Sequence, residues 1–161
     1  MGKGFKYATI IVVILFSLFI LYKVKILFEG EKGKILRIIY KAKTATEKED
    51  LFKCISFISR NYNDKYGNDR RSLFLIAQTI FDVYDNIVIG IRRLDISLDT
   101  DIARAQLEAS GVARNIERKE SNIFETETIK FIIFFQKEEE GWKVIKLEFL
   151  EPQEILQPGI T

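Results

Sequence analysis

The sequence predicts an α+β domain that follows a single membrane-spanning helix. Three observations support this prediction. An uncharged apolar run covers residues 7–22, apolar side chains recur at helical spacing from Ile35 to Phe81, and after Asn86 they alternate with polar ones. Alternation with a period of two is typical of strands with one buried face. Helices followed by a run of strands indicate an antiparallel sheet with helices packed on one face.

Composition restricts the chemistry that this chain can perform. Residues 1–28 hold four of the 25 basic residues and none of the 23 acidic residues, so the remainder has a net charge of −2. Residues 29–161 therefore have no basic field and are not expected to bind nucleic acid. The chain has no His and one Cys, Cys54. These counts exclude His-dependent nucleophiles, His-ligated metals and an internal disulfide, so we expect no cofactor and no metal.

The apolar run YATIIVVILFSLFILY is expected to anchor the protein in a lipid bilayer. Its 16 residues would span about 24 Å as a helix, which is short of a hydrocarbon core of about 30 Å. Lys23 can snorkel to the interface, and residues 24–28 extend the span. No small-residue cleavage site follows, which favours an uncleaved anchor over a signal peptide. We therefore divide the chain into an anchor (1–28), a junction (29–33), a domain (34–151) and a tail (152–161).

Charges around the anchor leave its orientation open. The C-terminal flank carries more Lys and Arg than the N-terminal flank, and the positive-inside rule then favours a cytoplasmic domain. A very short tail before a first apolar segment usually stays inside, which places the domain outside. We expect a single-pass protein of the inner or plasma membrane with an extracytoplasmic domain.

Three helices are expected before the strands. Apolar residues predict a first helix through Ala45, and Thr46 with Glu49 form a capping box that predicts a second helix starting at Thr46. Turn-forming residues fill 61–68, and a third helix begins near Asp69. Arg70 and Arg71 lie in its first turn, where the helix dipole disfavours cations, so they could mark a partner contact. The apolar stripe of the third helix consists of Leu73, Ile76, Ala77, Ile80, Phe81 and Tyr84.

Four strands form the predicted antiparallel meander. The inward parity changes at Arg92 and Arg93 and again between Val144 and Ile145, and one extra residue at each point would produce a β-bulge. The inner face predicted from this parity consists of Ala103, Ala105, Leu107, Ala109, Ile129, Phe131, Ile133, Phe135, Trp142 and Val144. None of these side chains is ionisable.

Three segments together resemble the nuclear transport factor 2-like (NTF2-like, cystatin-like cone) superfamily. They are ISRNYNDKYGNDRRSL, FDVYDNIVIGIRRLDISLDTDIARAQLEASG and IKFIIFFQKEEEGWKVIKLEFLEP, and the resemblance covers roughly residues 33–151. It implies a curved, bulged sheet wrapped around helices, with a cone-shaped pocket. Within the superfamily the chain looks most like uncharacterised bacterial single-pass proteins. The fold hosts isomerases, dehydratases, hydrolases, transport adaptors and secretion-assembly components, so it does not determine function.

The resemblance directs attention to the inside of the cone. The row of alanines could leave a cavity for an apolar ligand or could admit close helix packing. Asp64 is the one acidic residue expected near the pocket mouth and is the catalytic candidate, although turn formation explains it equally well. The candidate pocket-lining residues are Tyr62, Tyr66, Tyr84, Ala105, Leu107, Phe131, Ile133 and Trp142.

Three functions are compatible with these observations. The first is a membrane-anchored, non-enzymatic module that binds a protein or an apolar ligand, as a homodimer or with another membrane-associated protein. The second is a small-molecule enzyme of the isomerase or dehydratase type that uses Asp64 and a Tyr. The third is a bitopic secretion-assembly component. A cavity larger than about 300 Å³ with Asp64 or a Tyr hydroxyl pointing into it would favour the enzyme.

Overall fold

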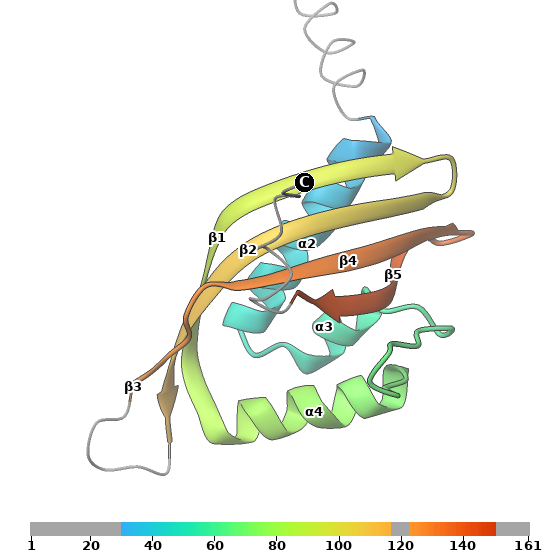
Figure 1. Cartoon of the computed structure of the whole chain (residues 1–161). Helices are drawn as coiled ribbons and strands as arrows, with labels where there is room; N and C mark the ends of the chain where they lie inside the picture. Colours follow the sequence, from blue (N-terminus) through green and yellow to red (C-terminus); the bar gives the residue numbers. More distant parts are fainter. Residues whose placement is uncertain (1–29, 117–122, 151–161) are drawn as a thin grey trace, which may run out of the picture.

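A computed structural model describes residues 30–116 and 123–150 of the chain (Figure 1). In this part three helices precede the strands: α2 (Glu31–Glu47), α3 (Leu51–Ser56) and α4 (Arg70–Val83). The strands are β1 (Tyr84–Asp99), β2 (Ile102–Asn115), β3 (Ile123–Glu125), β4 (Ile129–Glu138) and β5 (Gly141–Phe149). The predicted α+β class, with helices before an antiparallel sheet, is confirmed.

The sheet is a curved antiparallel meander with the strand order β1-β2-β4-β5. Figure 1 shows long, bent β1 and β2 beside the shorter β4 and β5, with α2 lying along one face of the sheet. The short strand β3 pairs with the end of β2 and was not predicted. The sheet bends because it contains irregularities in register, which increase local twist.

Both predicted bulges are confirmed. In β1 the register with β2 shifts between Ile91 and Arg93, so that Ile91 and Leu94 both oppose inward-facing β2 residues. In β5 the register with β4 shifts between Val144 and Lys146, which leaves Ile145 as the extra residue. A third shift, between Asp85 and Val88, was not predicted. Each bulge lets a strand change parity while keeping apolar side chains on the inner face.

The prediction of a helix start at Thr46 is wrong. Helix α2 continues through Thr46, whose hydroxyl donates to the carbonyl of Ala42 at 2.9 Å. The next helix begins instead after Asp50, whose carboxylate accepts the backbone N–H of Lys53 at 3.0 Å. A Thr inside a helix can satisfy its hydroxyl one turn back, so the capping pattern alone does not set a helix start. Helix α2 begins at Glu31, inside the stretch predicted as a junction.

The core lies between α2 and the inner sheet face. Ile35 and Ile39 of α2 pack against Ala103, Ala105 and Leu107 of β2, and the core is completed by Tyr62, Phe135, Trp142 and Val144. Ile129, predicted to face inward, is 41% exposed because it begins a strand at the edge of the core.

Helix α4 packs less tightly than its apolar stripe predicted. Leu73 contacts the core, but Ile76 and Ile80 are 45% and 43% exposed. Asp69 caps the helix by accepting the backbone N–H of Ser72 at 2.7 Å. The predicted helix start near Asp69 is therefore confirmed. Figure 1 shows α4 at the far side of α3 from the sheet, where it forms an outer layer.

The predicted membrane anchor lies outside the described residues. Within 30–116 and 123–150, none of the helices has both the length and the apolar character needed to cross a bilayer. Membrane anchoring therefore stays a prediction from the sequence.

Candidate functional site: an apolar pocket in the cone

A pocket of about 240 Å³ lies between α2 and the inner face of the sheet. Its lining comes from one helix and four strands: Ile38, Ile39, Ala42, Lys43, Thr46, Ile89, Ile91, Leu107, Ala109, Phe131, Ile133, Phe135 and Val144. Apolar side chains dominate this surface, as in sites that bind small apolar molecules.

Strand pairing places the sheet residues of the pocket side by side. Leu107 of β2 pairs with Phe131 of β4, and Ala109 pairs with both Ile91 of β1 and Ile129. The β1 bulge matters here because it lets Ile91, on one side of it, and Leu94, on the other side, both face inward. The small side chain of Ala109 leaves space beside its larger neighbours, and that space contributes to the pocket.

The polar residues of the pocket lining are occupied by other protein groups. Lys43 donates to the Glu47 carboxylate at 2.6 Å, and the same carboxylate oxygen accepts the backbone N–H of Ile89 at 2.9 Å. Burial raises the pKa of Glu47, but the hydrogen bonds from Ile89 and Lys43 outweigh it and lower the pKa overall. A carboxylate with a lowered pKa is a weak base. The Thr46 hydroxyl donates to the Ala42 carbonyl. Neither Lys43 nor Thr46 therefore offers a free acid or base to a ligand in the pocket.

Asp64 holds its own loop together and does not line the pocket. One carboxylate oxygen accepts the backbone N–H groups of Tyr66 and Asn68, both at 2.9 Å. The other accepts the Tyr62 hydroxyl and the Asn68 side-chain amide, both at 3.0 Å. Burial raises the pKa of Asp64, but these hydrogen bonds outweigh it, so the pKa is lowered. The arrangement is that of a buried loop anchor rather than a general base.

The candidate tyrosines also lie away from the pocket lining. Tyr62 is buried, and burial together with the bond to Asp64 raises the pKa of its hydroxyl. Tyr66 is 51% exposed and packs at a tilt against Phe149, with the ring centroids 6.0 Å apart. Tyr84 is the first residue of β1 and pairs with Asn115.

Of the other predicted residues, Leu107, Phe131 and Ile133 line the pocket, whereas Ala105 and Trp142 do not. Ala105 is fully buried in the core. The Trp142 indole N–H donates to Glu31, and the bonds from Lys34 and Trp142 lower the pKa of Glu31 to about 2.

Sequence reasoning missed the helix side of the pocket. Ile38, Ile39 and Ala42 repeat at helical spacing, which predicts the apolar face of a helix but not a binding site. Their position facing the bulged sheet makes them part of the lining. The signal was present in the stripe, but only a three-dimensional arrangement shows that packing leaves space beside it. Among residues 30–116 and 123–150, no group of Cys, Asp or Glu side chains could hold a metal ion.

No protein-family model matches this sequence, and no curated protein matches it. Solved structures do match the fold. An NTF2-like superfamily protein from Salmonella enterica serovar Typhimurium is 14% identical with a TM-score of 0.65, over 81% of this chain and 94% of that one. The described part of the chain has the NTF2-like fold.

Two further structures share this NTF2-like fold. A candidate scytalone dehydratase from Novosphingobium aromaticivorans is 10% identical with a TM-score of 0.65, over 75% of this chain and 85% of that one. Bd1075 from Bdellovibrio bacteriovorus is 14% identical with a TM-score of 0.61 over 73% of this chain. The match spans only 40% of Bd1075. At these identities the likeness establishes the fold alone.

Proposed function

We propose that this protein is a non-enzymatic, membrane-anchored module that binds a small apolar ligand in its cone pocket. The observation that carries the proposal is the pocket itself, whose lining is apolar and whose two polar side chains, Lys43 and Thr46, are engaged within the protein. Such a surface favours ligands by burying their apolar area and provides no group to transfer a proton.

The volume of the pocket limits the size of the ligand. Apolar cavities of about 150 Å³ are known to hold benzene, and pockets for drug-sized molecules begin near 300 Å³. At about 240 Å³, the cone fits a one- or two-ring aromatic molecule or a short aliphatic chain. The enzyme alternative is less well supported, because Asp64 and the three tyrosines do not line this pocket.

The outer face of the sheet is poorly suited to dimerisation. Glu108 forms ion pairs with Arg93 at 3.7 Å and with Lys130 at 3.5 Å, and Lys146 pairs with Glu148 at 2.5 Å. A face covered by charged side chains that already pair with one another has little apolar area to bury against a second copy.

Naphthalene binding to the full-length protein in phosphatidylcholine nanodiscs tests this proposal. With isoleucine methyl groups labelled for NMR, we expect saturable shifts at Ile39 and Ile133 and none at exposed Ile102. The variant Ala42→Leu, which fills the pocket, should abolish saturation. Thr44 lies on the exposed side of the same helix, so the control variant Thr44→Leu should bind naphthalene like the parent. A linear, unsaturable response, or unchanged binding in Ala42→Leu, would contradict the proposal.

A further inference from the structure

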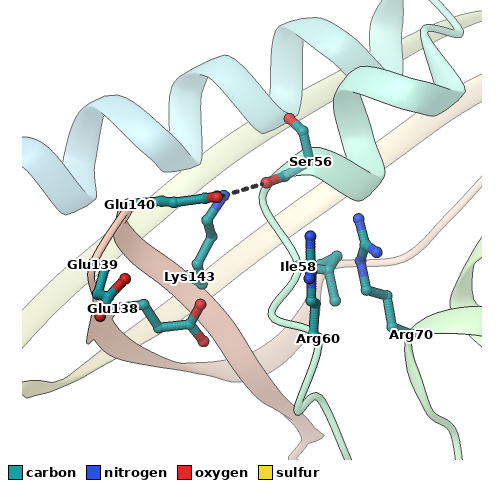
Figure 2. Close-up of a pocket in the computed structure, with 8 residues that line it drawn as sticks. All are labelled: Ser56, Ile58, Arg60, Arg70, Glu138, Glu139, Glu140 and Lys143. Atoms are coloured by element: carbon teal, nitrogen blue, oxygen red, sulfur yellow. Dashed lines mark hydrogen bonds and ion pairs between the residues drawn. The ribbon is translucent and has the colours of Figure 1, made fainter.

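We propose that a second cleft, separate from the cone pocket, binds a small zwitterion such as a dipeptide with both termini free. This cleft has a volume of about 440 Å³ and lies between the α3–α4 segment and the turn that joins β4 to β5. It is lined by Ser56, Ile58, Arg60, Arg70, Glu138, Glu139, Glu140 and Lys143 (Figure 2).

The two walls of the cleft carry opposite charges. Figure 2 shows Arg60 and Arg70 extending side by side from one wall, with Glu138 and Glu139 on the other. Within the described part of the chain, no ion pair joins these arginines to these glutamates; Lys143 and Glu140 pair at 3.5 Å at one end of the cleft. Opposite charges that are held apart leave room for a molecule that carries both.

Arg70 is incompletely satisfied by the protein. Its Nε atom is buried without a hydrogen-bond partner among the described residues, and Nη2 donates to the Ile55 carbonyl at a long 3.4 Å. A buried charged donor without a partner is costly, so the charge of Arg70 is poorly compensated by the protein. Guanidinium groups bind carboxylates through two parallel hydrogen bonds, and the terminal Nη atoms of Arg70, which lines the cleft, can bind a ligand carboxylate in this way. Arg60, which is exposed, makes no ion pair with any described residue and can contribute to the same carboxylate.

The backbone fixes the distance between the walls. The segment after α3 bonds to β5 in both directions: Val144 N–H donates to Phe57 at 2.9 Å, and Ser59 N–H donates to Val144 at 2.8 Å. The Ser59 hydroxyl also donates to Glu138 at 2.5 Å, and Lys143 donates to the Ser56 carbonyl at 2.9 Å. A cleft held in this way loses little conformational entropy on binding.

The acidic wall distinguishes a zwitterion from a simple anion. Glu138 and Glu139, which form no ion pair with any described residue, would repel a ligand that carries only negative charge, whereas an ammonium group is attracted to them. The ligand class that fits both walls therefore has a carboxylate at one end and an ammonium at the other. Free amino acids and short peptides have this chemistry.

Titration of the full-length protein in phosphatidylcholine nanodiscs with diglycine tests the assignment. We expect saturable binding by calorimetry and a shift of the Arg70 Nε–H signal in NMR spectra. N-acetyl-diglycine and diglycine amide each lack one charge and should bind about tenfold more weakly or worse. Equal binding of N-acetyl-diglycine or of inorganic phosphate would overturn the zwitterion assignment in favour of a simple anion site. Absence of diglycine binding would overturn it outright.

Single-residue variants locate the binding on the two walls. Arg60→Gln and Glu139→Gln change exposed side chains, so both variants should fold, which the fluorescence of Trp142 reports. Each should weaken diglycine binding about tenfold. The controls Arg92→Gln and Glu127→Gln remove exposed charges outside the cleft and should leave the affinity unchanged. Naphthalene binding in the cone should be unaffected by all four, so failure of one site is distinguishable from failure of the other.

Discussion

At the scale of single residues, Asp64 shows how one side chain can organise a loop. Its carboxylate accepts four hydrogen bonds, from Tyr62, Tyr66 and twice from Asn68. These bonds favour the ionised form, so the folded pKa lies below the unfolded value of about 3.9. The stability that this group contributes is therefore fully present above the unfolded pKa and is lost as the pH falls through the folded pKa.

The variant Asp64→Asn should consequently be less stable than the parent at pH 7. We expect a loss of about 1–3 kcal/mol, because the new amide group places a donor where Asn68 also donates. The difference should shrink as the pH falls through the lowered folded pKa of Asp64, because the parent carboxylate then becomes protonated. Urea unfolding followed by Trp142 fluorescence measures both values. Asp82→Asn, on the exposed face of α4, is the control. A stability difference independent of pH would mean that ionisation of Asp64 does not stabilise the fold.

Ala105 and Gln106 are neighbours that face opposite sides of β2. Ala105 is 0% exposed, whereas Gln106 faces solvent. Ala105→Leu should therefore cost about 1–3 kcal/mol of unfolding free energy by overpacking the core. Gln106→Leu should change stability by less than about 0.5 kcal/mol. Urea denaturation of the two variants makes the comparison. If Ala105→Leu is neutral and blocks naphthalene binding, the pocket extends to this residue.

At the scale of secondary-structure elements, the β1 bulge decides which side chains reach the core. On one side of it Ile91 opposes Ala109, and on the other side Leu94, Ile96 and Leu98 oppose inward-facing β2 residues. If the same residues formed a regular strand without the bulge, one of these sets would point to solvent, because parity in a strand is strict.

Deletion of Arg92 should remove the bulge and still leave both apolar sets on the inner face, because Ile91 and Leu94 are then separated by Arg93 alone and alternate regularly. The deletion variant should therefore keep cooperative unfolding and lose less than the roughly 1.5–3 kcal/mol that exposing one of these apolar side chains would cost. Arg92→Ser keeps the chain length and should be close to neutral. Amide hydrogen exchange in β1 and β2 compares the two variants. Loss of protection in the deletion variant would show that the fold needs the bulge itself, and not only the inward parity of the apolar side chains.

At the scale of the whole molecule, attachment to a bilayer is the prediction with the largest consequence. The apolar run at 7–22 should keep the full-length protein in the membrane fraction in about 1 M NaCl, where the Debye length is only about 3 Å. Replacing Val13 and Phe16 together by Lys should release it, since each charge costs roughly 2.5–3.5 kcal/mol at the centre of a span. Replacing both by Leu should not. Release of the parent protein by salt alone would contradict an apolar anchor.

Much of the fold could be predicted because its signals are local. The alternation in β2, the parity changes around Arg92 and Ile145, and the cap at Asp69 each follow from a few neighbouring residues. The misplaced helix start at Thr46 shows the limit of such signals. Its hydroxyl had two satisfactory partners, a helix N-terminus or the Ala42 carbonyl, and packing of α2 selected the second.

The amino-acid sequence by itself determined that helices precede the long strands, where the parity changes around Arg92 and Ile145, that the inner sheet face carries no ionisable side chain, and that an apolar run is expected to enter a membrane. These properties depend on residue type and on spacing along the chain. Only the tertiary structure decided that Asp64 serves its own loop, that space remains between α2 and the sheet, and that Arg60 and Arg70 face Glu138 and Glu139 across a cleft. Each of these depends on distances between residues far apart in the chain, and the packing of the whole domain sets those distances.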